Sequence, residues 1–199
     1  MAAVEAQHRY AVVDVETSGL SARRHHVLQV GLVVVDQRGD VLDRFSSLLA
    51  PRHRWLFFRA GPTHIHGITR RQLRSAPPAA DVLRQLAQRI GDATLVAHNA
   101  QFDIAFLTKA ARRTGVDLPL GTALCTLTMS RRLDPDRQLS HRLGEVCARY
   151  GVTITRPHDA LSDADATAAI LPHLLRDTAA VAAASNDHTA SVANDHTEV

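Results

Sequence analysis

Apolar residues along this chain gather into runs of two kinds, and the first kind is short, dense and rich in β-branched residues. Such runs are typical of strands that are covered on both faces. The turn residues Gln37–Asp40 separate the second run from the third, so we expect those two strands to form a hairpin. The predicted strands are Tyr10–Val15, His26–Asp36, Val41–Leu49, Thr94–Ala97 and Ala123–Leu127.

The second kind of run places apolar residues three or four positions apart, which indicates amphipathic helices. Thr69 is a suitable N-cap for a short helix that ends before Pro77, and Asn99 is a suitable N-cap for the helix that follows the fourth predicted strand. Pro172 lies within the last predicted helix and is expected to kink or split it. Strands that pair first antiparallel and then alternate with helices predict an α/β layered domain. The longer predicted helices are Ala79–Ile90, Asn99–Thr114, Ser140–Tyr150 and Asp159–Leu175.

The two ends of the chain differ from this patterned centre. Residues 1–8 form a short extension before the first strand, and the pattern then runs through residues 9–178 as one domain. From Ala179 the chain is rich in Ala, Ser and Asn, and the segment NDHT occurs twice. We therefore expect residues 179–199 to be a disordered tail, and a docking peptide for a partner is the alternative role for it.

Composition places the chain among ordinary globular proteins, with 45% hydrophobic and 22% charged residues. The two cysteines, Cys125 and Cys147, are far apart and lack the spacing of a zinc site, which favours a reducing cytoplasm. The N-terminal residues MAAVEAQHRY lack the apolar core of a signal peptide. No run approaches about 18 apolar residues, so we expect a cytoplasmic protein without a membrane segment.

Arginine carries nearly all of the positive charge, because Lys109 is the only lysine among the 23 basic residues. A compositional bias of the source genome explains this preference, and phosphate binding is the alternative, since the guanidinium fork matches phosphate oxygens. The net charge of +3 alone is too small to indicate a nucleic-acid partner. The candidate phosphate contacts are the pairs Arg23-Arg24, Arg70-Arg71 and Arg131-Arg132.

Two acids interrupt the first predicted strand near its carboxyl end, in the stretch VVDVETSGL. Asp14 and Glu16 are two residues apart, so their side chains project from the same face of the strand. Two like charges held there repel each other and raise each other's pKa, whereas a divalent cation favours both charged forms. Alone, this pattern is a weak indication of a metal site, because surface strands also carry such acids.

Two further acidic segments lie at the starts of predicted helices. In HNAQFD, His98–Asp103, the acid Asp103 lies in the first turns of a helix, where a solvated acid favoured by the helix dipole is the simpler interpretation. In HDALSDADA, Asp163 follows His158 by five residues and lies beside small residues that allow close packing. Asp159 is explained as an acid at a helix N-terminus and Asp165 as a solvent-facing one.

Together, DVETSGL, HNAQFD and HDALSDA resemble the three motifs of the DEDDh 3′–5′ exonucleases, a family that includes proofreading subunits of bacterial replicative polymerases. HGIT at His66–Thr69 also resembles a family segment, and the resemblance covers most of the chain. It implies a ribonuclease-H-like mixed sheet and an exonuclease domain over residues 9–178. It further implies that His158 is the general base and that two divalent ions, Mg²⁺ or Mn²⁺, bind to Asp14, Glu16, Asp103 and Asp163.

The same resemblance suggests which residues touch the substrate. Backbone N–H groups of Thr17, Ser18 and Gly19 are candidates to bind the 3′-hydroxyl of the terminal nucleotide. Leu20 and Phe102 are candidate contacts to its base or sugar, with plain core packing as the alternative, and His66 is a candidate to line the pocket. The aromatic residues Trp55, Phe57 and Phe58 fit loop packing better than base stacking.

The function expected from the sequence is metal-dependent hydrolysis at the 3′ end of single-stranded DNA, which releases nucleoside 5′-monophosphates. One alternative is an exoribonuclease that trims RNA or oligoribonucleotides, distinguished by contacts to the 2′-hydroxyl. An alternative of another class is an accessory subunit that acts mainly by docking onto a DNA polymerase. The sequence leaves the oligomeric state open.

Overall fold

A computed structural model describes residues 8–51 and 58–194 of the chain, with side chains up to residue 184. A mixed sheet lies at its centre, in the order β3-β2-β1-β4-β5. The first three strands pair antiparallel, and β4 and β5 then add in parallel, which confirms the predicted mixed α/β sheet. The strands are β1 (Arg9–Thr17), β2 (Val27–Asp36), β3 (Val41–Leu48), β4 (Thr94–Ala97) and β5 (Leu124–Cys125).

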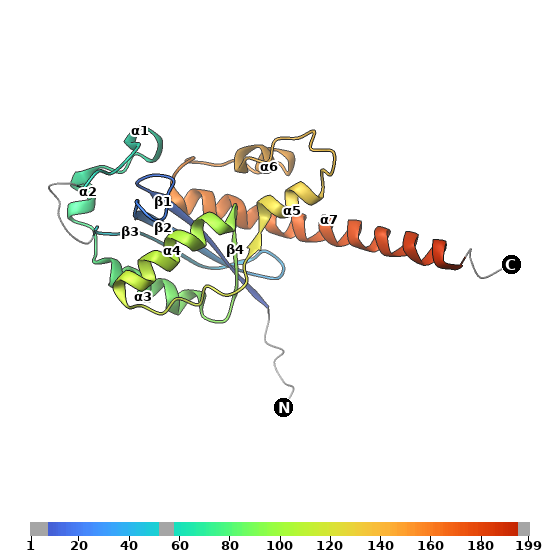
Figure 1. The fold of residues 1–199 in the computed structure, drawn as a ribbon, viewed down its shortest axis with the longest axis horizontal. Coiled ribbons are helices and arrows are strands. Elements are labelled where there is room, and N and C mark those ends of the chain that lie inside the picture. Colours follow the sequence, from blue (N-terminus) through green and yellow to red (C-terminus); the bar gives the residue numbers. More distant parts are fainter. Residues whose placement is uncertain (1–7, 52–57, 195–199) are drawn as a thin grey trace, which may run out of the picture.

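Helices cover both faces of this sheet (Figure 1). The predicted cap at Thr69 is confirmed, since its hydroxyl accepts the Gln72 N–H in a capping box at the start of α2. Strand β5 is only two residues long, and the sequence analysis missed the helix α5 that directly follows it. The helices are α1 (Thr63–His66), α2 (Arg70–Arg74), α3 (Ala79–Ile90), α4 (Ala100–Thr114), α5 (Thr126–Arg132), α6 (Leu143–Arg149) and α7 (Ala160–Asn194).

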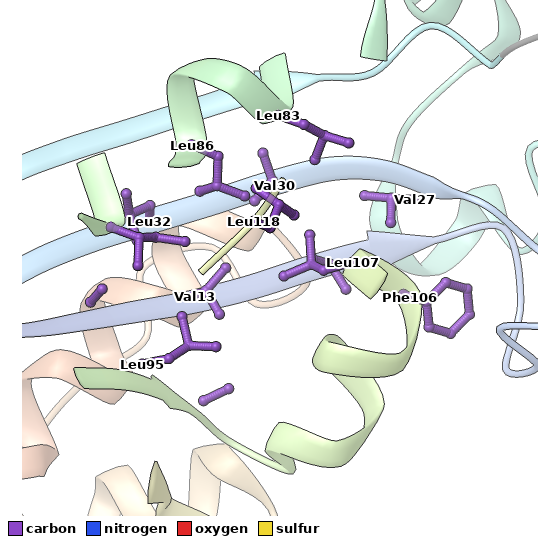
Figure 2. Packing of buried hydrophobic residues seen from close by; sticks show 14 of the residues in the cluster. Val13, Val27, Val30, Leu32, Leu83, Leu86, Leu95, Phe106, Leu107 and Leu118 are labelled. Atoms are coloured by element: carbon purple, nitrogen blue, oxygen red, sulfur yellow. The ribbon is translucent and has the colours of Figure 1, made fainter. Parts of the chain in front are cut away.

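Alternate residues of β1 face two separate hydrophobic layers. Val13 and Val15 point toward α3 and α4, where Leu86 and Leu107 belong to the same buried cluster (Figure 2). Val12 points the other way and packs with residues of α7. Because side chains two apart share a face, Asp14 and Glu16 project on the α7 side of the sheet.

Gly31 allows α7 to approach this part of the sheet closely. Gly31 is the cross-strand partner of Asp14, so a side chain there would occupy the same face. A Cβ atom built on Gly31 would lie 2.2 Å from the carbonyl oxygen of Ala160, the first residue of α7. The missing side chain therefore lets the start of α7 lie beside the acids of β1.

Helix α7 departs from the sequence prediction at two places. It continues across Pro172 instead of being split there, and Pro172 packs against Gly39 in the turn between β2 and β3. It also extends to Asn194, whereas disorder was expected from residue 179, because its alanine-rich continuation has high intrinsic helix propensity. Among the described residues, no helix is long and apolar enough to cross a membrane.

Replacing Gly31 with alanine tests the close approach of α7 to the sheet. The added methyl group meets backbone atoms that cannot move aside, so we expect the free energy of unfolding to fall by about 2–3 kcal/mol. Urea denaturation measures this change. Gly144→Ala in α6 is the matched control, because no atom lies within 4 Å of its new Cβ. An equal, small effect of both substitutions would contradict the close packing.

Candidate active site

The carboxyl end of β1 has an open edge that a side chain from α4 occupies. Strand β4 pairs with β1 only as far as Val12, so the later residues of β1 have no parallel neighbour on that side. Asp103, in the first turn of α4, accepts a hydrogen bond from the backbone N–H of Val15 at 3.1 Å. Because β4 ends before it reaches these residues of β1, a buried carboxylate fits directly beside Asp14 and Glu16.

The segment that leads into α7 brings a histidine and an acid to the same place. His158 has a left-handed backbone with φ of 64°, and its N–H donates to Oδ2 of Asp163 at 3.1 Å. One ligand atom each from Glu16, His158 and Asp163 lie within 4.8 Å of one another. His158 is exposed at the mouth of this cluster, while Asp163 is half-buried. The start of α7 therefore meets the end of β1, where Asp103 of α4 also lies.

Gln29 of β2 anchors the start of α7. Its amide nitrogen donates to Asp159 at 3.2 Å, and its amide oxygen accepts the N–H of Ala160 at 3.4 Å. Asp159 also accepts the Ser162 N–H at 3.1 Å, as expected of an acid that caps a helix. Asp165, by contrast, turns away and forms an ion pair with Arg44 of β3 at 2.8 Å.

Sequence reasoning missed the positioning roles of Gln29 and Gly31. Gln29 lies opposite Glu16 in the β1–β2 register, two positions along the strand from the Asp14–Gly31 pair and on the same face. Both residues interrupt an otherwise apolar strand, and an isolated strand glycine often marks a close backbone approach. That interruption was the signal available in the sequence.

Burial and mutual repulsion make the acids of this site hard to ionise together. Burial raises the pKa of Asp14 well above its ordinary value, and the charges of Asp103 and Asp163 raise it further. Burial also raises the pKa of Glu16 to about 7 and that of Asp103 to about 8. The pKa of Asp163 is raised by burial too, although the N–H of His158 acts in the opposite direction. Without a cation, these carboxyl groups therefore keep protons at pH values where ordinary carboxyl groups are fully ionised.

This donor set fits a divalent cation. Oδ1 of Asp163 is buried and has no hydrogen-bond partner among the described residues, as expected of an oxygen reserved for another ligand. The cluster offers several carboxylate oxygens, the ligands that hard cations such as Mg²⁺ prefer. A cation among them would favour the charged form of every acid.

The residues predicted to bind the substrate lie in and around the loop after β1. The Ser18 N–H already donates to the carbonyl of His26 at 2.9 Å, so it is not open to a ligand, and the Ser18 hydroxyl accepts the His26 N–H. The Thr17 hydroxyl donates to the carbonyl of Gly19 at 2.9 Å, which shapes the turn. Leu20 is 87% exposed, which excludes core packing as its role.

His66 and Phe102 flank the site in different ways. The buried ring of His66 accepts the Ile68 N–H at Nδ1 and donates from Nε2 to the carbonyl of Ala60, so it holds its own loop in shape. Burial lowers the pKa of His66, consistent with a neutral ring. Phe102 is half-buried and packs against Phe106, with ring centroids 4.8 Å apart.

Two further expectations concern aromatic residues and the cap of α4. Phe58 is buried in a satellite cluster with Leu28 and Leu73, as expected for loop packing. Trp55 and Phe57 lie outside the described residues. Asn99 precedes α4 in a left-handed conformation with φ of 73° and makes no side-chain cap, so the expectation that it caps the helix is wrong. The backbone turn from β4 into α4 uses that conformation instead.

The raised pKa values predict how stability depends on pH and metal. Unfolded carboxyl groups titrate near pH 4, so these acids bind protons more tightly in the folded chain. In a chelator, the resulting stabilisation is full below about pH 4 and is lost as the pH rises to about 8. We expect the melting temperature of the chelated protein to fall over that range, and Mg²⁺ or Mn²⁺ to remove the fall.

Thermal unfolding followed by circular dichroism measures this effect. Asp14→Asn should flatten the pH dependence in chelator and weaken the stabilisation by metal, because it removes one charge from the cluster. Asp165→Asn is the matched control and should retain both effects, since Asp165 pairs with Arg44 outside the cluster. Identical pH profiles with chelator and with metal would contradict a cation site.

Comparison with known proteins places this geometry in a family. A family model for exonucleases, RNase_T, matches residues 11–171. The chain is 37% identical over 174 residues to the PolC-type DNA polymerase III of Bacillus subtilis, which is 87% of this chain and 12% of that protein. It is 36% identical over 172 residues to the PolC-type enzyme of Bacillus cereus, again 12% of that protein. The chain thus spans a small part of these relatives.

Solved structures show the same fold at low sequence identity. The nuclease domain of 3′hExo, a DEDDh family member bound to rAMP, has a TM-score of 0.72 and 15% identity, covering 87% of this chain and 94% of that one. Escherichia coli exonuclease I with a dT13 oligonucleotide has a TM-score of 0.71 and 17% identity, covering 84% of this chain and 41% of that one. These likenesses confirm the predicted ribonuclease-H-like sheet. With the family match and the three acidic motifs, they show that the chain belongs to the DEDDh 3′–5′ exonucleases.

Proposed function

We propose that this protein is a metal-dependent 3′–5′ exonuclease that releases nucleoside 5′-monophosphates from the 3′ end of single-stranded DNA. The observation that supports this most strongly is the buried Oδ1 of Asp163, which has no partner among the described residues and belongs to a cluster with Glu16 and His158. Asp14 and Asp103 lie close enough to this cluster that the acids raise one another's pKa. Such a cluster destabilises the folded chain unless a cation joins it, so its retention fits a catalytic use. The catalytic domain in this proposal spans residues 9–178.

Asp14, Glu16, Asp103 and Asp163 would hold two divalent ions, Mg²⁺ or Mn²⁺. When bound, such ions supply Lewis acidity that makes water nucleophilic near neutral pH and offsets charge on the leaving oxygen. Asp103 is oriented for this task by the Val15 N–H, and Asp163 by the N–H of His158. Each of these carboxylates keeps an oxygen that its backbone donor does not use.

His158 is the proposed general base. Its ring lies exposed at the mouth of the cluster, within 4.8 Å of carboxylate oxygens of Glu16 and Asp163. An imidazole accepts a proton near physiological pH, so it can take one from the attacking water. As the new bond to phosphorus forms, the bond from phosphorus to the 3′-oxygen of the preceding nucleotide breaks. The released nucleotide keeps its 5′-phosphate.

The loop after β1 would hold the terminal nucleotide. Gly19 and Thr17 are the proposed source of backbone donors for the 3′-hydroxyl, while Ser18 shapes the loop through its bonds to His26. The exposed Leu20 and the half-buried Phe102 offer apolar surface to the base and sugar. His66 would act as a fixed wall of this pocket, since both of its ring nitrogens are already bonded.

An RNA substrate is the second candidate. DNA is favoured by the PolC-type polymerase relatives and by the likeness to exonuclease I with bound deoxyoligonucleotides. RNA is favoured by the likeness to 3′hExo with rAMP and to a 3′-exonuclease that recognises a histone mRNA stem-loop. Docking onto a DNA polymerase in the cytoplasm is a further proposal, supported by the polymerase relatives and the long extension of α7.

Substitutions within the cluster should abolish hydrolysis without unfolding the protein. We expect Asp14→Ala and Asp163→Ala to remove nearly all activity, and His158→Ala to lower kcat about 10²- to 10⁴-fold, the usual contribution of a general base. Asp165→Ala should retain activity, because Asp165 points to Arg44. Release of mononucleotides from an end-labelled oligonucleotide in Mn²⁺ measures this. Loss of activity in Asp165→Ala but not in Asp163→Ala would show that the wrong acid was assigned.

Substrate choice can be settled with matched oligonucleotides of identical base sequence. We expect hydrolysis of the DNA strand in Mg²⁺ or Mn²⁺, none in chelator, and shortening from the 3′ end only. Labels at either end distinguish the direction of shortening. Faster hydrolysis of the RNA strand would replace the proposed substrate with the second candidate, and internal cleavage would contradict an exonuclease.

A further inference from the structure

A groove opens beside the acidic cluster, on the side of α5 and α6. Its volume is about 1020 Å³, at the top of the range for ligand sites and more than one nucleotide needs. His158 and Asp163 line one end of it, so the groove begins where the scissile phosphate is proposed to lie. In Figure 1, α5 and α6 lie on one side of the β1–β2 loop, and α1 and α2 lie on the other.

Two arginines, Glu145 and several apolar side chains line the rest of the groove. Leu127, Val152 and Ile154 supply apolar surface, and Arg131 and Arg142 supply positive charge. Both arginines are exposed, and within the described part of the chain their guanidinium groups make no hydrogen bond or ion pair. Unpaired guanidinium groups above apolar surface match a strand that carries phosphates along one side and bases along the other.

A buried polar network holds the segment between these arginines in one shape. Asp134 accepts the N–H of Leu139 at 2.9 Å and pairs with the His141 ring at 3.2 Å. Ser130 lies 2.9 Å from the other ring nitrogen of His141 and accepts a hydrogen bond from Arg149 at 2.7 Å. Such a network of buried polar contacts rigidifies the wall of the groove.

The same segment is tied to the catalytic end of the sheet. Nε2 of His98, the residue that follows β4, donates to the carbonyl oxygen of His141 at 3.0 Å. His141 immediately precedes Arg142, and His98 lies five residues before Asp103. The position of Arg142 is therefore fixed relative to the acids, which is what a phosphate contact near the reaction needs.

We propose that this groove binds the nucleic-acid strand on the 5′ side of the scissile bond, with Arg131 and Arg142 contacting its phosphates. The inference rests on the proposed function for the direction of the strand: the terminal nucleotide lies at Leu20 and Phe102, and the remainder leaves past His158. Longer substrates then gain affinity from the groove, whereas a dinucleotide does not reach the arginines.

A second basic hollow is the alternative surface for the nucleic-acid strand, and the test must distinguish it from the groove. This hollow has a volume of about 610 Å³ and is lined by Arg23, Lys109, Arg112 and Arg113 on the outer side of α4. None of the catalytic residues lines it, and the Lys109 ammonium is already bonded to the carbonyls of Arg23 and His25. Arg112→Ala therefore reports on a strand path along α4 instead of the groove.

Binding can be measured without hydrolysis in an Asp14→Asn background. We expect Arg131→Ala and Arg142→Ala each to weaken binding of a fluorescent thymidine octanucleotide about tenfold. Together they should reduce the salt dependence, the slope of log K against log[salt], by about 1.4, since each phosphate contact to a single strand contributes about 0.7. Fluorescence anisotropy over a salt series gives both quantities.

Arg132→Ala is the matched control. Arg132 lies beside Arg131 in α5 and carries the same charge, but it does not line the groove. In the active protein, the double variant should lower kcat/KM for the octanucleotide while leaving that for a dinucleotide within about twofold. Equal effects of the double variant and Arg132→Ala would overturn the inference, as would a larger effect of Arg112→Ala. If the protein binds through Arg131 but hydrolyses nothing, the groove stands and the proposed function fails.

Discussion

Repulsion among buried carboxylates is the constraint on which the rest of this structure depends. Asp14 has its pKa raised by burial and then by four neighbouring acids, and no arginine or lysine among the described residues lowers it again. A chain free of functional demands would replace such a cluster with apolar residues, since a buried charge without a partner destabilises the fold. The cluster makes physical sense once a divalent cation is counted as part of the protein.

The scaffold tolerates this repulsion because rigid elements fix each acid. Val13 and Val15 anchor one face of β1 in the larger core, which forces Asp14 to the opposite face. Gly31 then lets α7 lie directly over that face, and the short β4 leaves an edge for Asp103. A site built on a central strand and two helix starts holds its geometry better than one built on loops.

Sequence patterns predicted the part of the molecule that periodicity controls. The first three strands, α3 and α4 lie close to their expected ranges, because alternation and helical spacing reflect burial directly. Asp14 and Glu16 were found by their shared face, but Asp103 and Asp163 needed the family motifs, since an acid at a helix start has a simpler explanation. The role of Gly31 required coordinates, because the carbonyl it accommodates lies in a residue far along the chain.

Other departures arise from local competition that a pattern does not resolve. The weak strand signal at Ala123–Leu127 covers two strand residues and the first turn of α5, because β-branched and apolar residues fit both states. The composition of the chain after residue 179 suggested disorder. The extension of α7 into this segment reflects the high helix propensity of alanine. The backbone turn from β4 into α4 sets the left-handed conformation of Asn99, and its side chain does not cap the helix.

The central claim, that the acids of three segments share bound cations, is tested most directly by a crystal structure of the protein soaked in Mn²⁺. An anomalous difference map locates manganese without reference to the protein coordinates. We expect strong peaks beside the carboxylate oxygens of Asp14 and Asp163, at roughly the 2 Å distances typical of such small cations with oxygen ligands. A map without manganese between these carboxylates, in crystals that bind it elsewhere, would contradict the account.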